Sequence, residues 1–251
     1  MISNAVRLSV CSGSFLYTFY VMCNFMIFLS SHSGNQKLVE LTETEDEEED
    51  TILMTIQYLM INTCLIGAFV LQHSLMASDF IKRIFCSLKI EDLERSIYNA
   101  CSAGALHLLI KFWTPISSII LWNINTIQNS KISLVMTVFQ IVGWIIIYSG
   151  CLMMDIGELV GIKQVIYKIK NLPSPISTKS RELKRYFSRM RHPSYIGFLF
   201  ILWIHPFMSL DRLLLALLLT VFMTMMWNID EQDYHYHLKS LERKKRNLNH
   251  S

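Results

Sequence analysis

Charged residues are scarce in this chain: Asp, Glu, Lys and Arg together make up 17% of its 251 residues. Hydrophobic residues account for 52%, and the mean hydropathy is +0.34. The apolar residues stand in long blocks. This composition excludes an ordinary soluble domain and is typical of a protein that crosses a membrane several times.

Several short motifs are also missing. None of the six cysteines has the spacing of a metal or redox site, so no metal is expected. The last three residues form no prenylation motif. No internal repeat and no Gly/Ser-rich linker divides the chain, so the apolar blocks carry its organisation.

Six apolar blocks predict six transmembrane helices and therefore an all-α, polytopic membrane protein. The blocks run over residues 6–29, 52–75, 97–113, 132–154, 195–208 and 210–227. The first exceeds the roughly 7–15 apolar residues of a signal peptide and lacks a clear cleavage site, which favours a membrane span. The fifth is short against the roughly 20 residues that cross a bilayer, so its basic lead-in or a thinned bilayer must supply the rest. Pro206 and residues 209–212 predict a tight turn into the sixth block and hence a C-terminal helical hairpin.

A polar stretch over residues 30–50 ends in six consecutive acidic residues, 45–50. Runs of like charge are typical of disordered segments, so a loop is expected there. We therefore divide the chain into a first helix with an acidic lumenal loop, 1–50, and a membrane domain, 51–251.

The positive charges are distributed unevenly between the two sides of the predicted membrane. With six spans, nineteen of the 23 Lys and Arg residues fall on one side. The exceptions are Lys37, Lys111, Lys131 and Arg212. The excess of Lys and Arg on the inner side of membrane proteins predicts that both termini are cytosolic or nucleoplasmic.

A second kind of helix is predicted between the fourth and fifth blocks. Leu159, Ile162, Ile166 and Ile169 recur at helical spacing, with lysines between them. This pattern predicts an amphipathic helix that lies on the cytosolic surface of the membrane. The segment 172–175, Leu-Pro-Ser-Pro, ends it.

In this topology, polar residues next to five of the six spans gather in one layer on the cytosolic side. Gln72 and His73 end the second span, Glu158 follows the fourth, and Glu231 follows the sixth. Ionisable residues at such places often line a shared cavity. The alternative is a ring of solvated or salt-bridged charges, and both interpretations stay open.

The fifth block is preceded by the most informative motif, residues 191–197. Pro193 predicts the start of a helix that runs to about Pro206, with an N-terminus that attracts anions. Arg191 can clamp a carboxylate, Tyr195 offers a flat face, and Gly197 permits close approach to the backbone. The alternative is a basic flank with a proline cap at the mouth of a membrane helix.

The motif Arg-His-Pro-x-Tyr-x-Gly, followed one hairpin later by Glu231, resembles the integral-membrane methyltransferases. These include isoprenylcysteine carboxyl methyltransferase and the bacterial methanethiol S-methyltransferases. A closer resemblance covers nearly the whole chain from Thr51 onward and is to the nurim family of the inner nuclear membrane. The stretches that carry it are Gln72-His73-Ser74-Leu75-Met76-Ala77, Glu94-Arg95-Ser96-Ile97-Tyr98, Lys111-Phe112-Trp113-Thr114-Pro115-Ile116, Glu158-Leu159-Val160-Gly161-Ile162-Lys163-Gln164-Val165, Asp211-Arg212-Leu213-Leu214-Leu215-Ala216 and Asp230-Glu231-Gln232-Asp233.

The resemblance implies residence in the inner nuclear or endoplasmic reticulum membrane and an S-adenosylmethionine pocket at the C-terminal hairpin. The implied cofactor-binding residues are Arg191, His192, Pro193, Tyr195, Gly197 and Glu231, and the implied pocket lining is Gln72, His73 and Glu158. No direct nucleic-acid binding is expected. The implied partners are the bilayer, a lipophilic small-molecule substrate and nuclear envelope proteins.

One segment departs from the methyltransferase pattern. After the Glu, those enzymes continue with Phe-Gly and spaced tyrosines that lead to a proline. Here residues 234–238 read Tyr-His-Tyr-His-Leu, and no proline follows. Two functions therefore stay open: a structural protein of the inner nuclear membrane, and an S-adenosylmethionine-dependent methyltransferase acting on a thiol or carboxylate of a lipophilic substrate.

Overall fold

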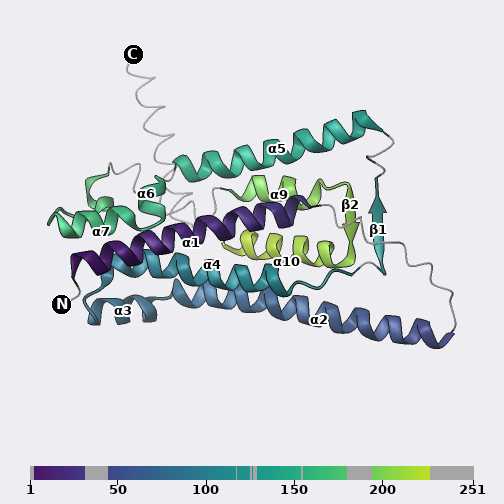
Figure 1. The fold of residues 1–251 in the computed structure, drawn as a ribbon, viewed down its shortest axis with the longest axis horizontal. Coiled ribbons are helices and arrows are strands. Elements are labelled where there is room, and N and C mark those ends of the chain that lie inside the picture. Colours follow the sequence, from purple (N-terminus) through teal and green to yellow (C-terminus); the bar gives the residue numbers. More distant parts are fainter. Residues whose placement is uncertain are drawn as a thin grey trace, which may run out of the picture.

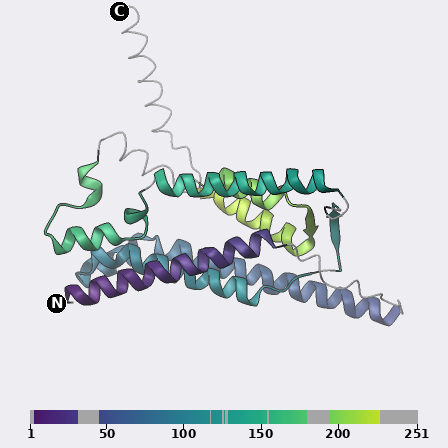
Figure 2. The ribbon, with the colours of Figure 1, turned by 45° about the horizontal axis from the view of Figure 1, so that its top comes forward.

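The computed structural model describes residues 3–31, 45–116, 118–124, 126, 129–153, 155–179 and 194–226. These residues are mostly helical, as the sequence predicts, and form an elongated bundle (Figures 1 and 2). The elements are α1 (Asn4–Ser30), α2 (Glu45–Met76), α3 (Asp79–Ser87), η2 (Glu91–Leu93), α4 (Glu94–Phe112), β1 (Ile120–Asn123), α5 (Ser130–Met153), α6 (Ile156–Leu159), α7 (Ile162–Ile169), η3 (Pro175–Thr178), α9 (Tyr195–Trp203), β2 (Phe207–Ser209) and α10 (Leu210–Met226).

Three helices within the described residues are long and apolar enough to cross a membrane. They are α1, the segment Thr51–Met76 of α2, and α5. They correspond to the first, second and fourth predicted spans. The described residues therefore support a membrane protein, whereas the number of six spans stays a prediction.

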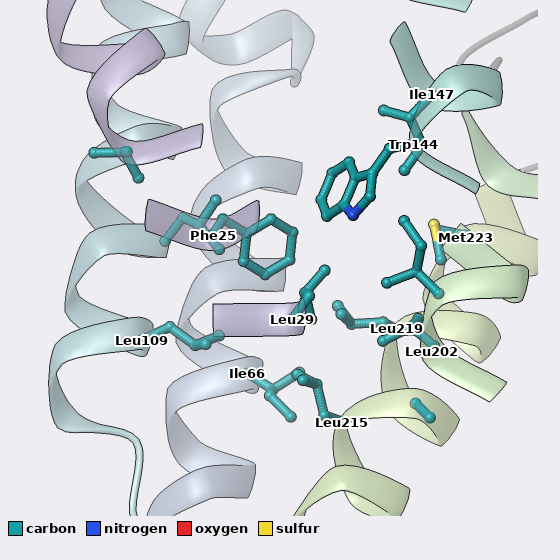
Figure 3. Close-up of a cluster of buried hydrophobic side chains, with 14 of the residues drawn as sticks. Phe25, Leu29, Ile66, Leu109, Trp144, Ile147, Leu202, Leu215, Leu219 and Met223 are labelled. Atoms are coloured by element: carbon teal, nitrogen blue, oxygen red, sulfur yellow. The ribbon is translucent and has the colours of Figure 1, made fainter. Parts of the chain in front are cut away.

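Two groups of helices enclose the hydrophobic core. In one group α4 packs against α1 and α2, and in the other α9 packs against α5 and α10. The contact of α10 with α2 joins the groups. Figure 3 shows the apolar side chains that meet between them, including Phe25 from α1, Ile66 from α2, Leu109 from α4, Trp144 from α5 and Leu215 from α10. Because burial of these side chains is shared by helices distant in sequence, the core holds the spans in one unit.

The outer faces of the long helices are also apolar. Leu16 and Phe19 of α1, Met60 of α2 and Leu134 and Ile145 of α5 are all at least 60% exposed. Large exposed apolar surfaces of this kind are exceptional in water and ordinary in lipid.

The fifth predicted helix is wrong at its C-terminal end. α9 stops at Trp203, and Phe207–Ser209 forms the strand β2, which pairs with β1 in an antiparallel sheet. Pro206 explains the change, because it has no N–H for a helix and biases the preceding residue towards extended backbone. The all-α prediction therefore misses one two-stranded sheet, which ties the lead-in of α10 to the segment before α5.

One helix start differs from the prediction. The residues Glu45–Asp50, expected in a loop, begin α2. α9 begins at Tyr195, the first residue of the fifth predicted block, and the N–H of Phe198 donates to the carbonyl of Ser194 at 3.0 Å.

The amphipathic helix between the fourth and fifth blocks is confirmed as a helix, α7, but its apolar side faces the protein. Val165 is fully buried and packs with Cys11 of α1 and Leu93 of η2. Ile162 and Ile169, from the predicted stripe, pack against the same cluster. The predicted contact of this face with the membrane surface is therefore wrong, since helical spacing reveals an apolar face but not what covers it.

Candidate functional site

Three of the stretches singled out in the sequence meet where α4 begins. Tyr98 of α4 places its hydroxyl 2.7 Å from Nε2 of His73 in α2. The side chain of Asn99 donates to the carbonyl of Leu159 at 2.9 Å, which attaches α6 to the same part of α4. The predicted layer thus receives α2, α4 and α6 together (Figure 1).

The C-terminal hairpin reaches the same layer. The ring of Phe222 in α10 lies edge-on against His73, with 6.0 Å between ring centroids. Two residues further along α10, Thr224 hydrogen-bonds to the hydroxyl of Tyr195 at 2.8 Å. At the other end of α9, Nε1 of Trp203 donates to Thr220 at 3.0 Å. These two pairings run in opposite directions along α9 and α10, so the predicted antiparallel hairpin is confirmed over the described residues.

Gln72 is the side chain in this layer whose environment most needs an explanation. Its amide oxygen and amide nitrogen are both buried, and neither has a hydrogen-bond partner in the part of the chain that the structure describes. An unsatisfied buried polar group costs about 1–3 kcal/mol, and native proteins keep few of them. The amide therefore offers a donor and an acceptor to a polar ligand or water beside His73.

Glu158 has a partner of its own. It is buried, and its carboxylate forms an ion pair with the ammonium of Lys179 at the end of η3. Gln164 donates to the backbone carbonyl of Glu158 at 3.1 Å. These contacts anchor the segment that leads towards residues 180–193, whatever else Glu158 does.

A second ion pair holds the same turn. The hydrogen bond from the Lys163 ammonium keeps the pKa of the Asp155 carboxyl below its ordinary value, and the pKa of Lys163 is raised by the same bond. The Lys163 side chain is 40% exposed and the Asp155 side chain 34%, so the pair contributes little to stability. The backbone of Asp155 has a positive φ of 61°, in the left-handed region.

Gly197 makes a close approach, and its neighbour is α5. A Cβ atom at Gly197 would lie 2.6 Å from the carbonyl oxygen of Gly143 and 2.7 Å from Cγ1 of Ile147. Small residues let two membrane helices approach backbone to backbone. The glycine of the motif therefore has a packing role in the helix bundle, and its predicted role in binding a cofactor stays a prediction.

The other motif residues lie outside the described residues. These are Arg191, His192, Pro193 and Glu231, together with the predicted approach of Glu231 to Arg191. The cofactor-binding and pocket-lining roles of the whole predicted set stay predictions.

A polar network at the opposite end of the bundle was not predicted. The buried carboxylate of Asp211 accepts hydrogen bonds from Nε1 of Trp113 at 2.9 Å, the N–H of Ile116 at 3.1 Å and Ser209 at 2.6 Å. Asn62 of α2 makes three hydrogen bonds to Thr114. The available signal was the presence of Asn and Asp inside or beside apolar blocks, where an unpaired polar group is costly.

Arg212 completes this end of the molecule. Its guanidinium donates to the carbonyls of Leu29 at 2.7 Å and Ser31 at 2.9 Å, at the C-terminus of α1. The last carbonyls of a helix have no partner within it, so Arg212 caps α1 and joins it to α10.

The fold and these contacts define a helical membrane protein whose helices are tied together by one polar layer at each end. Comparison with known proteins gives the family. The chain belongs to the nurim family, so the family resemblance seen in the sequence is confirmed.

The similarity extends over almost the full length of the insect relatives. The nurim homologue of Drosophila pseudoobscura pseudoobscura is 36% identical over 236 residues, which are 94% of this chain and 93% of the relative. That of Drosophila melanogaster is 34% identical over 247 residues, 98% of each chain. Human nurim is 39% identical over 178 residues, 70% of this chain and 68% of the human protein. No family model and no solved structure matches the chain, and the relationship to the methyltransferases stays a prediction.

Proposed function

We propose that this chain is a six-span protein of the inner nuclear membrane with a structural role and both termini in the nucleoplasm. The structural role rests on the contacts made by the stretches that resemble the nurim family. Trp113, Thr114 and Ile116 are hydrogen-bonded to Asn62 and Asp211, so these stretches hold helices to one another. Residence at the nuclear envelope comes from the family resemblance.

Six spans are supported by the lengths and directions of the elements. α2, α5 and α10 end where α4 and α9 begin, as alternating spans require (Figure 1). At 1.5 Å per residue, α4 is about 28 Å long and α10 about 26 Å, close to the roughly 30 Å of a hydrocarbon core. α9 covers only about 14 Å, and the strand β2 that follows it runs across the helix axes instead of extending the span (Figure 1).

Non-helical backbone at membrane depth needs cover from the protein. All three residues of β2 are buried, and its backbone pairs with β1. Extended backbone is tolerated in a membrane where it is paired and covered in this way. The connection from α9 to α10 is therefore acceptable at membrane depth, and α9 alone is a short fifth span.

The topology can be tested with inserted glycosylation acceptors. An acceptor placed near Gln36 should be glycosylated, because the loop after α1 is lumenal in this proposal. One placed near Ser177, in the long segment between the fourth and fifth spans, should stay unmodified. A mobility shift on gels, reversed by glycosidase, measures both, and the opposite pattern would overturn the topology.

The location can be tested with a C-terminal tag. We expect a nuclear-rim signal that antibody reaches only after the nuclear membranes are permeabilised, because a nucleoplasmic tag is shielded from antibody in the cytosol. Truncations within the membrane domain should lose this retention. A tag found chiefly at the plasma membrane after selective permeabilisation would contradict the proposal.

A second function, S-adenosylmethionine-dependent methyl transfer, is favoured by the unsatisfied amide of Gln72. Gln72 precedes His73, which hydrogen-bonds to Tyr98, in the layer that the hairpin enters through Tyr195 and Thr224. A bound cofactor would supply an activated methyl group, so the protein would need mainly to position the reactants and exclude water.

The roles in that second function follow the resemblance. Arg191 would hold the cofactor carboxylate, Tyr195 would contact its rings, and Glu231 would accept from ribose or amino groups. His73 or His192 would orient a substrate thiol. The hydrogen bonds of His73 to Tyr98 and Ser102 suit an orienting role, since they fix the imidazole ring.

Calorimetry on purified protein in detergent separates the two functions. If the protein binds S-adenosylmethionine, Arg191→Ala and Glu231→Ala should each abolish the binding heat, because each removes a charged contact to the cofactor. Lys168→Ala, an exposed change on α7, is the matched control and should bind like wild type. No binding by the folded wild-type protein would exclude the methyltransferase and leave the structural role.

A further inference from the structure

The short helix α3, which follows α2, has two apolar sides with different environments. Phe80, Ile84 and Leu88 recur at intervals of four residues and form one stripe along the helix and its C-terminal cap, here called the α3 stripe. Their exposed fractions are 65%, 40% and 61%. Three large apolar side chains are thus presented together on one outer face.

The other apolar side fixes the orientation of α3. Phe85 is only 8% exposed, and Ile81, one turn before it, is half-buried. The N–H of Ile81 is capped by the hydroxyl of Ser78, and the N–H of Ile90 donates to the carbonyl of Phe85 at 3.1 Å. With Phe85 held in the protein, α3 cannot rotate to bury its stripe.

The position of α3 in the chain indicates what covers the stripe. Two residues separate it from α2, whose segment Thr51–Met76 can cross a membrane. The last turns of α2 expose Leu71 at 60% and Leu75 at 54%. A helix attached this closely to the end of a span lies at the bilayer surface, and the α3 stripe continues the apolar surface of α2.

The polar side of α3 has the charge that such a location favours. Lys82, Arg83 and Lys89 are exposed, against the single acidic residue Asp79, giving a net charge of +2 (three minus one) over residues 79–89. Lys82 pairs with Asp79 at 3.0 Å, which leaves Arg83 and Lys89 as the excess cations. Basic residues next to a span attract anionic lipid headgroups.

We propose that α3 is a membrane-contact helix whose stripe Phe80, Ile84 and Leu88 is covered by lipid, with its basic side at anionic headgroups. This assigns to α3 the role that the sequence pattern suggested for α7. The two helices differ in exposure: Ile162, Val165 and Ile169 of α7 pack inwards, while the α3 stripe points out.

Tryptophan scanning of the full-length protein in vesicles tests the lipid contact. Phe80→Trp should add fluorescence that lipids with brominated acyl chains quench and aqueous iodide does not. Lys82→Trp, two residues on and on the opposite, exposed side of the helix, is the matched control and should show the reverse. Subtraction of the wild-type signal removes the five native tryptophans. Iodide quenching of Phe80→Trp as strong as that of Lys82→Trp would overturn the proposal, because the stripe would then face water.

The charged side is tested by lipid-dependent melting in detergent. Phosphatidylserine should raise the melting temperature more than phosphatidylcholine does, and Arg83→Gln/Lys89→Gln should remove most of that difference. Lys168→Gln on α7 should keep it. Equal effects of the two lipids on wild type, or an unchanged difference in the double variant, would refute the headgroup contact.

Discussion

Gly197→Ala is expected to destabilise the folded protein by about 2 kcal/mol or more, whereas Gly67→Ala should leave its stability unchanged or slightly higher. The added Cβ at Gly197 would lie 2.6 Å from the backbone oxygen of Gly143, a contact that no side-chain rotation relieves. Overpacking of this kind typically costs about 1–3 kcal/mol and sometimes more. At Gly67, in the membrane helix α2, the same methyl group meets nothing within 4 Å.

Thermal melting of the purified variants in detergent, followed by size-exclusion chromatography, measures this difference. Gly143→Ala tests the other side of the crossing and should behave like Gly197→Ala, because its Cβ would lie 2.7 Å from Ile201. Wild-type melting of both variants would show that α5 and α9 do not cross at these glycines. The chemical change is identical in the control, so a general effect of alanine in a helix is excluded.

This result would also bear on how the motif at 191–197 is interpreted. The close crossing of α5 and α9 is enough to explain why the motif has a glycine, and the tyrosine of the motif contacts Thr224 across the hairpin. Two of the motif's residues thus help to assemble the bundle. A cofactor role has to be established for Arg191 and Glu231 by binding measurements.

The sequence predicts the long helices well because length and hydropathy determine them. The first, second and fourth blocks correspond to α1, α2 and α5, and their ends lie close to those expected except at the start of α2, which begins at Glu45 instead of Ile52. These helices depend only on their own residues, because an apolar segment in lipid must satisfy its own backbone hydrogen bonds, and a helix does so. The resemblance to the nurim family can also be found from the sequence alone, since it rests on short motifs and their order along the chain.

The features that the sequence could not reveal depend on distant partners. The pattern at 120–123 does not indicate that this strand pairs with residues 207–209, far along the chain. The stripe of α7 predicts a helix, but only α1 and η2 decide that its apolar side is covered. His73 and Tyr98 were both singled out, yet their hydrogen bond depends on how α2 crosses α4.

The network around Asp211 leads to the second large effect. Asp211→Ala should destabilise the protein by about 3 kcal/mol or more, since it leaves three donors unpaired and each such group costs about 1–3 kcal/mol. These donors are on Trp113, Ile116 and Ser209. Thermal melting in detergent measures the loss, and Asp79→Asn, on the exposed surface of α3, is the control that should melt like wild type.

The conservative variant Asp211→Asn separates the lost hydrogen bonds from the lost volume. One amide oxygen can still accept from Ile116 and Ser209, while the amide nitrogen replaces the oxygen that accepts from Nε1 of Trp113. We therefore expect a smaller loss than in Asp211→Ala. Trp113→Phe removes the donor left without an acceptor, so it should cost less in the Asp211→Asn background than in wild type. Groups in direct contact show such coupling, of about 0.5–3 kcal/mol. Additive effects of the two changes would mean that Trp113 and Asp211 do not interact.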